Sequence, residues 1–434
     1  MAFYLKGVHL PHRKHTACMS PVRMDTPKTV TIPTAMHIGA PATPVVKAGD
    51  TVSVGTLIAE QNGFVSSPVY SSVSGTVAKI DEILLSNGKT APAVVINSDG
   101  QMTKDSNIVP PTVNSREDML EAMKKSGIVG LGGAGFPTYV KFNTDKNIEE
   151  LIINGAECEP YITSDSVTMV EKSEDIKYAI DMLLKYFDIN KVIIGIENNK
   201  PEAIKAMQEL ASGNESISVN VLPPVYPQGG EKVLVYHTTG KVIPMGKLPI
   251  DVGCVVCNST TVATFGKYLK TGMPLVEKCI TVDGGAVKEP KNVIVPIGVS
   301  VGEVFDFCGG FISEPAKVLY GGPMMGISVP DLTAPVIKNT NAILAFSEKE
   351  AILPKTTACI RCGACVNVCP FGINPPAIAR AYKNEDFETL KAVGTTLCME
   401  CGCCSYVCPA MRPLVQNNRL AKQALAQHKA KEAK

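Results

Sequence analysis

Two cysteine runs in the last quarter of the chain limit what it can fold into more than any other feature. Both follow the spacing C-x2-C-x2-C-x3-C-P, the first as CIRCGACVNVCP and the second as CMECGCCSYVCP. Domains with this spacing bind two [4Fe–4S] clusters, because three close thiolates hold one cluster and the fourth, fixed by its proline, reaches the other. We therefore predict one cluster on Cys359, Cys362, Cys365 and Cys408, and a second on Cys398, Cys401, Cys404 and Cys369. Two clusters held in this crossed way lie close together, which suits single-electron transfer.

Zinc is the competing interpretation of these cysteines. Zinc sites use pairs of cysteines separated by longer loops, and runs of four that end in proline are not their pattern. The spacing therefore favours iron–sulfur clusters. One additional cysteine, Cys403, stands beside Cys404, and we expect it to be a small core residue rather than a ligand.

The remaining composition narrows the class of protein. Nine of the 15 cysteines lie between positions 359 and 408 and no export signal precedes them, so we expect a reducing, cytoplasmic compartment. No run approaches the roughly 18 apolar residues of a spanning helix, so membrane association is expected only through partner subunits. The net charge of +1 and the absence of Trp argue against a nucleic-acid partner. A length of 434 residues suffices for about three domains.

The N-terminal part reads as a series of short strands between positions 30 and 98, with turns at Gly49, Gly55, Gly63 and Gly75. The segments VKAGDTVSVGTLIAE and SSPVYSSVSGTVAKID resemble the two halves of a lipoyl- or biotinyl-like barrel-sandwich domain. Such carriers bear a modified lysine between the halves, whereas here the stretch QNGF (61–64) has none. We therefore predict a structural or docking barrel-sandwich domain over 1–110, without a swinging arm.

The rest of the chain is predicted to be multidomain α/β and α+β. Between about 115 and 275, apolar β-branched runs such as LIING and KVIIGI alternate with amphipathic helices, which indicates a largely parallel sheet. Ser115 suits the start of the first of these helices. Short β runs and small helices return over 276–328, and the basic end of the chain, 417–434, is predicted to be a solvated helix.

A glycine-rich loop, GIVGLGGAGFP (127–137), precedes the first of these strands. Gly130, Gly132 and Gly135 match G-x-G-x-x-G, but this match alone is weak because the loop follows a helix rather than a strand. Closely spaced glycines let a ring or a phosphate approach the backbone N–H groups. A tight structural turn is the alternative, although turns seldom need four glycines.

Four motifs together make the chain recognisable. GLGGAGFPTYVKF resembles the flavin loop of the NADH-binding subunit of respiratory complex I, and INGAECEPYIT, YPQGGEK and CNSTTVA resemble other flavin and nucleotide segments of that superfamily. In the sequence, a barrel-sandwich domain precedes these motifs and the two cluster runs follow them. This order is similar to that of the RnfC family, whose members are components of the Rnf electron-transport complexes. The resemblance implies an FMN/NADH-binding domain over 111–275, a β-grasp (SLBB-like) module over 276–330 and a helical 2[4Fe–4S] ferredoxin domain over 345–434.

The resemblance also implies individual roles. Glu159 would lie where the nicotinamide nucleotide binds and is the expected catalytic residue. The FMN would contact Gly130, Gly132, Gly133, Gly135, Lys141, Asn154 and Glu157, with a further wall from Tyr226, Gly229, Gly230 and Glu231 and a phosphate side from Asn258 and Thr261. Without the family, Glu157 and Glu159 could equally be solvated loop acids and Lys141 an ordinary helix lysine.

Two departures from the family pattern concern the N-terminus and Cys257. FYLKGVHLPHRKHTACM is more similar to a soluble paralogue, the electron-transfer protein associated with clostridial proline reductase, and we expect His9, His12 and His15 to be surface or packing residues. Cys257 is the second candidate catalytic residue, because it forms C-x-x-C with Cys254 and a dithiol beside a flavin can have one acidic thiol and exchange electrons. The other interpretation is two buried small residues in a strand, and the residues alone slightly favour it.

We therefore predict an NADH-dependent oxidoreductase, an iron–sulfur flavoprotein that connects NADH to a low-potential carrier. The resemblance implies the membrane subunits of an Rnf-type complex and a ferredoxin-type carrier as partners. Two alternatives stay open: a soluble paralogue that delivers electrons to a terminal reductase such as proline reductase, and a ferredoxin-like relay whose flavin fold is empty.

Overall fold

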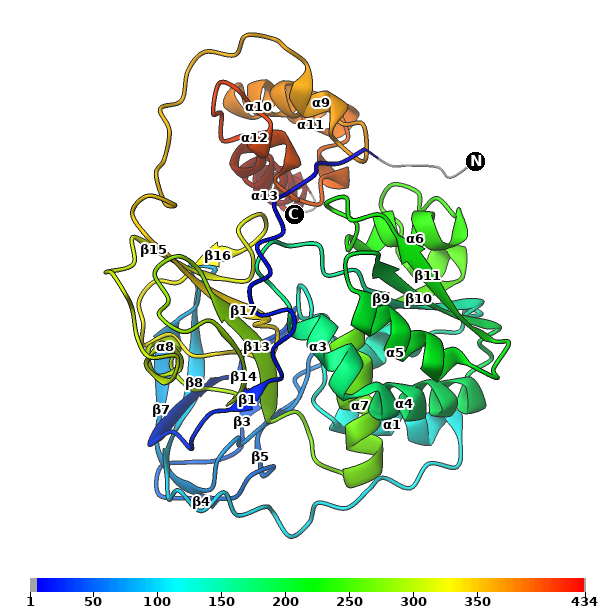
Figure 1. Ribbon diagram of the computed structural model, residues 1–434, viewed down its shortest axis with the longest axis vertical. Coiled ribbons are helices and arrows are strands. Elements are labelled where there is room, and N and C mark those ends of the chain that lie inside the picture. Colours follow the sequence, from blue (N-terminus) through cyan, green and yellow to red (C-terminus); the bar gives the residue numbers. More distant parts are fainter. Residues whose placement is uncertain (1–5, 433–434) are drawn as a thin grey trace.

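The computed structural model describes residues 6–432. Three bodies can be distinguished in Figure 1: β-sheets on one side, an α/β domain on the other and a helical domain at one end. This architecture confirms the predicted multidomain α/β and α+β class. No helix within residues 6–432 has both the length and the apolar character needed to cross a membrane.

The N-terminal barrel-sandwich domain is built from two small antiparallel sheets. Alternating residues such as Val30, Ile32, Val94 and Ile96 are buried between them, which is why these short strands stay together. One sheet has the order β2 (Thr29–Pro33), β8 (Thr90–Ser98), β7 (Gly75–Leu84), β4 (Thr51–Val52), and the other β3 (Thr43–Pro44), β5 (Leu57–Glu60), β6 (Val69–Tyr70).

The α/β domain contains a four-stranded parallel sheet with the order β11 (Ile217–Leu222), β10 (Lys191–Glu197), β9 (Glu150–Gly155), β12 (Cys254–Asn258). Helices cover both of its faces, since odd-numbered residues of β9 such as Ile153 pack in one core and Ile152 packs in another. The helices are α1 (Arg116–Lys125), α2 (Thr138–Phe142), α3 (Ser164–Glu171), α4 (Ser173–Tyr186), α5 (Pro201–Ala211), α6 (Glu231–Thr239) and α7 (Ser259–Thr271). As predicted, Ser115 caps α1 by accepting from the N–H of Asp118.

A mixed six-stranded sheet follows, with α8 (Val301–Phe307) packed on it. It draws strands from outside the expected 276–330 module, because its first strand comes from the N-terminal segment and its central β17 from beyond position 330. The order is β1 (Val22–Arg23), β14 (Lys291–Pro296), β13 (Glu277–Asp283), β17 (Ala342–Phe346), β15 (Lys317–Tyr320), β16 (Ile327–Ser328).

The C-terminal domain is helical and lies at one end of the molecule (Figure 1). It comprises α9 (Ala364–Asn367), α10 (Pro375–Lys383), α11 (Phe387–Ala392), α12 (Cys403–Tyr406) and α13 (Leu414–Glu432). The prediction of a fully solvated basic helix at the end is wrong for one face of α13. Leu414, Asn418, Ala421 and Leu425 are buried, and their spacing of three to four residues forms the stripe that packs on α10.

An extended N-terminal segment, residues 6–21, ties the bodies together, and we call it the strap. In Figure 1 it runs from the helical domain, between the other two bodies, to β1. The N–H of Val8 donates to the carbonyl of Tyr226 over 2.8 Å, and the N–H of Tyr226 donates back over 3.0 Å. Further along, Nδ1 of His15 lies 3.1 Å from the Asp283 carboxylate in the mixed sheet. The strap therefore contacts the α/β domain and the mixed sheet before it reaches the barrel.

Candidate functional site

The carboxyl ends of the parallel strands gather most of the predicted nucleotide-site residues at one edge of the sheet, where α/β folds bind ligands. Asn154 is near the end of β9 and Asn258 ends β12. Nδ2 of Asn154 donates to the carbonyl of Gly229 over 2.9 Å, and its Oδ1 accepts from the N–H of Ala156 over 3.0 Å. This residue therefore joins two of the walls that the sequence predicts.

The glycine loop lies against the start of α7. The N–H of Gly130 donates to the carbonyl of Phe136 over 2.8 Å and closes the loop, while the N–H of Leu131 donates to Oγ1 of Thr261 over 3.0 Å. Gly132 touches Asn258 so closely that a Cβ there would lie 2.3 Å from its Nδ2. Gly133 is exposed and has open space beside it. The loop thus presents backbone on one side and is anchored on the other.

Asn258 and Glu157 hold the helices that begin at this edge. Oδ1 of Asn258 accepts from the N–H of Thr261 and so caps α7, while its Nδ2 donates to Asp165 over 2.7 Å. The buried carboxylate of Glu157 accepts from the N–H of Asp165 and from the hydroxyl of Ser166, both over 2.8 Å, at the start of α3. Glu157 is therefore not a solvated loop acid.

Glu159 is held by a loop of the mixed-sheet module, residues 321–326. Its carboxylate accepts from the N–H of Met324 over 3.1 Å and from the N–H of Met325 over 2.8 Å. Gly322 packs on the same carboxylate, so a side chain at that position would collide with it. Burial raises the pKa of Glu159 to about 7, and the two N–H donors oppose this shift. The predicted nucleotide acid thus sits at a contact between two domains.

Lys141 and Glu231 form a further polar pair at the site. Nζ of Lys141 donates to Glu231 over 3.1 Å and to the carbonyl of Val256 over 2.8 Å. Gly229 packs on the carbonyl of Ala156, with only 2.2 Å between that oxygen and an added Cβ. The structure therefore brings the glycine loop, the loop after β9, the 226–231 segment and the start of α7 together.

Lys14 of the strap is a site residue that the sequence analysis missed. Its Nζ is buried and donates to three carbonyls of the loop after β9, those of Glu157 over 2.8 Å, Glu159 over 3.0 Å and Ile162 over 2.5 Å. Burial lowers the pKa of Lys14, and the nearby Glu157 carboxylate opposes that shift. Nothing in the run HLPHRKHT marks this lysine, because its partners lie more than 140 residues away.

Lys278 of β13 is a second missed residue. Its buried Nζ donates to the carbonyl of Leu131 in the glycine loop over 2.5 Å. Burial lowers the pKa of Lys278 and raises that of Asp165, while the attraction between the two groups opposes both shifts. The loop is thus supported from behind by a buried polar group of the mixed sheet.

The structure contradicts a redox pair formed by Cys254 and Cys257. They are three residues apart on β12, so their side chains point to opposite faces of the sheet and pack in different cores. Burial raises the pKa of Cys254 to about 12 and that of Cys257 to about 11, whereas a reactive thiol needs a lowered pKa. Cys257 remains beside Lys141 and Glu231 as a single buried thiol.

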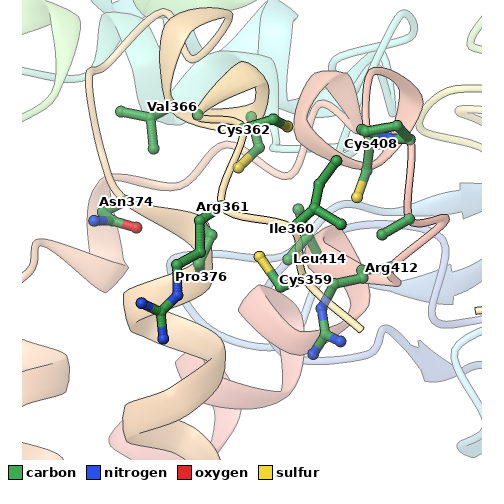
Figure 2. Close-up of a pocket in the computed structure, with 14 residues that line it drawn as sticks. Cys359, Ile360, Arg361, Cys362, Val366, Asn374, Pro376, Cys408, Arg412 and Leu414 are labelled. Atoms are coloured by element: carbon green, nitrogen blue, oxygen red, sulfur yellow. The ribbon is translucent and has the colours of Figure 1, made fainter. Parts of the chain in front are cut away.

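The first predicted set of cluster cysteines surrounds a cavity of about 220 Å³ in the helical domain. Figure 2 shows the sulfur atoms of Cys359, Cys362 and Cys408 directed into this space, with Arg361 and Arg412 at its rim. Cys365, the remaining cysteine of this set, lines the same cavity. A fourth thiol supplied by the other run is the arrangement that crossed ligation requires.

The second predicted set is buried. Cys369 lies close enough to Cys401 for the two to interact electrostatically, and Cys404 interacts with Cys369, Cys398 and Cys401. Within residues 6–432, no three His, Cys, Asp or Glu side chains converge as tightly as a single metal ion requires. The first set of four thiols lines one cavity and the cysteines of the second set lie close to one another, so two sets of four thiols are available for two [4Fe–4S] clusters.

The buried cysteine set contacts a segment that is predicted to line the nucleotide site. Tyr226, Val8, Leu10, Cys401 and Cys403 form one buried apolar cluster, which we call the junction. The hydroxyl of Tyr226 donates to the carbonyl of Cys401 over 2.7 Å. As expected from the sequence, Cys403 is a buried core residue.

Gly230 extends the junction toward the predicted flavin wall. It approaches Met399, whose Cε would lie 2.3 Å from an added Cβ. The 226–231 segment therefore touches both the predicted flavin site and the second cysteine run.

The residues at the sheet edge suit an FMN. Gly132, Gly133 and Ala134 are exposed and leave their backbone accessible, and the start of α7 with its partial positive charge lies directly behind them. Lys141 adds a cation next to this loop. A planar ring with a phosphate tail requires backbone access and positive charge of this kind.

Comparisons with known proteins agree with this arrangement. The chain matches four families, each over a separate stretch: the RnfC barrel sandwich hybrid domain over 3–101, the Nuo51 FMN-binding domain over 123–266, the SLBB domain over 279–328 and the 4Fe-4S dicluster domain over 351–409.

Proteins similar over nearly the whole chain are also known. The chain is 42% identical over 433 residues to the C subunit of the Na(+)-translocating ferredoxin:NAD(+) oxidoreductase complex of Acetobacterium woodii, with 98% of this chain and 97% of the relative covered. It is 40% identical to the corresponding protein of the proton-translocating complex of Clostridium ljungdahlii, with 86% and 83% covered. It is 38% identical to the corresponding protein of the ion-translocating oxidoreductase complex of Rhodobacter capsulatus, with 98% and 83% covered.

Proposed function

The chain belongs to the RnfC family of the Rnf-type ferredoxin:NAD(+) oxidoreductase complexes, and from this premise we propose that it passes electrons between NADH and a low-potential carrier. The overall exchange is NADH to NAD⁺, one proton and two electrons, which leave one at a time. FMN, when bound, supplies the change from hydride to single electrons, and the two [4Fe–4S] clusters supply single-electron storage.

One observation carries the proposal: the second cysteine run and a segment predicted to line the nucleotide site meet in the junction. Tyr226 is part of the predicted flavin wall and donates to the carbonyl of Cys401. A single-electron relay needs short distances between its redox groups, and this contact between the two segments supports such an arrangement. We infer that Cys398, Cys401, Cys404 and Cys369 hold the cluster nearer to the flavin, and that Cys359, Cys362, Cys365 and Cys408 hold the outer one.

The chain's own residues bind and orient in this proposal. The backbone of Gly132 and Gly133 with Lys141 would hold the flavin and its phosphate, and Glu159 would accept hydrogen bonds from the ribose of the nicotinamide nucleotide. Lys14 fixes the loop that carries Glu159. The loop over 321–326 would exclude water from this acid.

Anaerobic purification followed by NADH titration tests the proposal. We expect iron and acid-labile sulfide for two clusters, flavin absorbance that NADH bleaches, and paramagnetic resonance signals from reduced clusters. Material with clusters but without flavin absorbance, and without any response to NADH, would instead identify a ferredoxin-like relay.

The partners follow from the family and are proposed at two levels. The membrane subunits of an Rnf-type complex are the first expectation, with this chain held at the inner face of the membrane through them. A soluble terminal reductase such as proline reductase is the second, favoured by the N-terminal sequence FYLKGVHLPHRKHTACM. Copurification of the tagged native chain with membrane subunits or with a soluble reductase separates the two.

A further inference from the structure

The two cysteine runs repeat one local geometry, so the helical domain has two equivalent faces. Arg361 and Glu400, each at the same place in its run, have positive φ angles of 58° and 63°. The glycine two residues further on has a positive φ in both runs and precedes a short helix, α9 or α12. Ile360 and Met399 therefore occupy equivalent places beside the first cysteine of their runs.

The face around Met399 is covered by the rest of the protein. Met399 packs against the junction next to Tyr226. Glu400 is paired with two cations of α13, with Arg419 over 2.9 Å and with Lys422 over 2.6 Å. In the proposed function this covered face receives electrons from the flavin side.

The equivalent face around Ile360 is exposed to solvent. Ile360 is 69% exposed, and Cys359, Arg361 and Cys362 are exposed as well. Met411, which is 45% exposed, follows the second run. Ile360 lines the same cavity as Cys359, Cys362 and Arg412, so this exposed apolar side chain lies beside the predicted cluster site.

The charged side chains that line the cysteine cavity, Arg361 and Arg412, are both cations. Between positions 351 and 384 the chain carries the cations Lys355, Arg361, Arg380 and Lys383 and has no Asp or Glu. Arg412 adds a cation at the rim of the cysteine cavity. A basic rim around an apolar centre favours an acidic partner and steers its approach.

We propose that the face formed by Ile360, Arg361, Met411 and Arg412, called the carrier face, docks an acidic iron–sulfur carrier protein. In this proposal the carrier face contacts an external partner, just as the equivalent Met399 face contacts the flavin domain. This inference rests on the proposed function. In each encounter one electron leaves the reduced partner and arrives at the site of Cys359, Cys362, Cys365 and Cys408, or moves in the opposite direction; no bond forms and no proton moves.

The test compares Arg361→Glu with Lys431→Glu in the reconstituted full chain. Lys431 is exposed near the far end of α13, about 25 Å along that helix from the cavity. Its replacement by Glu changes the charge by the same amount as Arg361→Glu. The probe is an acidic 2[4Fe–4S] bacterial ferredoxin. Its Kd in the oxidised form is measured by calorimetry, and its electron-transfer rate by stopped flow at several salt concentrations.

We expect Arg361→Glu to weaken ferredoxin binding and slow transfer at least about tenfold at low salt, with a smaller dependence on salt. Lys431→Glu and Arg361→Lys should stay close to the native values. Equal Kd values for Arg361→Glu and Lys431→Glu would overturn the proposal. A slower transfer in Arg361→Glu with an unchanged Kd and a shifted cluster potential would also overturn the proposal. Arg361 would then only compensate the charge of the cluster.

Two further measurements separate other outcomes. NADH should bleach the flavin absorbance of Arg361→Glu at the native rate; if it bleaches neither the variant nor the native protein, the proposed function fails rather than the docking site. Sedimentation with anionic phosphatidylglycerol vesicles tests a membrane surface as occupant. Vesicle binding lost in Arg361→Glu together with unchanged ferredoxin transfer would contradict the acidic carrier.

Discussion

The ammonium of Lys14 has three protons and three carbonyl partners, all in the loop that carries Glu157 and Glu159. At this scale the proposed nucleotide site is supported by a few buried charges. Glu157 fixes α3, Lys14 fixes the preceding loop and Lys278 supports the glycine loop. Each of the two lysines is far in sequence from the group it holds.

Replacing Lys14 with Met should remove all three hydrogen bonds and leave their buried carbonyls without partners. Since an unsatisfied buried polar group costs about 1–3 kcal/mol, we expect the free energy of unfolding to fall by at least about 2 kcal/mol. We also expect a higher KM for NADH. Denaturant unfolding checks the first effect, with the exposed Lys6→Met on the same strap as control. Equal unfolding midpoints for the two variants would contradict the role of Lys14.

Glu159 predicts a pH dependence. Its pKa is raised from 4.5 to about 7, so its carboxyl is neutral below that pH and accepts hydrogen bonds as a carboxylate above it. The KM for NADH should therefore fall as the pH rises through the range around 7. The free energy of unfolding should change in the opposite direction. Because folding raises the pKa of Glu159, the folded protein loses stability as the pH rises from 4.5 to about 7.

Glu159→Gln should abolish this pH step and raise the KM while the protein keeps its flavin. The exposed Glu202→Gln on α5 is the matched control. Steady-state kinetics across the pH range makes the comparison. A Glu159→Gln variant with the native KM and the native pH profile would remove this acid from the nucleotide site.

At the scale of the elements, the glycine loop has one anchored and one open position. A Cβ on Gly132 would meet Asn258, which caps α7, whereas a Cβ on Gly133 meets nothing within 4 Å. The two glycines therefore serve different purposes. Gly132 allows close packing on a helix start, and Gly133 leaves space where the ligand is proposed to lie.

This difference predicts opposite results for two alanine variants. Gly133→Ala should unfold like the native protein but bind FMN about tenfold more weakly, which corresponds to about 1.4 kcal/mol. Gly132→Ala should displace the cap of α7 and lose about 1 kcal/mol of unfolding free energy. Flavin fluorescence titration and denaturant unfolding measure the two effects. If neither variant binds FMN more weakly than the native protein does, the loop is only a structural turn.

The elements were predictable where the signal is local. The cysteine spacing, the cap at Ser115 and the alternation of β9 to β11 with helices lie within short windows, and the structure agrees with them. The sequence analysis slightly favoured two buried residues over a Cys254–Cys257 redox pair, and both cysteines are buried, in different cores. Residues three apart on a strand point to opposite faces, and that geometry could have excluded the pair in advance. The buried stripe of α13 was hidden by its charged composition.

At the scale of the whole molecule, the junction connects the strap, the α/β domain, the 321–326 loop and the second cysteine run. These parts come from four regions of the chain, and no local pattern announces their meeting. Lys14 escaped prediction for the same reason. The position of Tyr226 in the flavin motif was recognisable, but its bond to Cys401 was not.

Tyr226→Phe should remove the bond to the carbonyl of Cys401 and loosen the contact between the two domains. We expect the NADH-dependent reduction of flavin to stay near the native rate and the following cluster reduction to slow several-fold. Stopped-flow spectroscopy resolves the two phases. Tyr406→Phe, half-exposed in the same helical domain, is the control. If both variants reduce their clusters at the native rate, this bond does not set the distance between the redox sites.

The strap has a consequence for how the molecule is made. Val8 and Leu10 leave the ribosome early, yet they share the junction with Cys401 and Cys403, which emerge long after them. Lys14 and Val8 can bind their backbone partners once the middle of the chain exists, but the contacts of Val8 and Leu10 with the second cysteine run can form only after that run has been synthesised. The last closure of the strap is thus a late step in the folding of this chain.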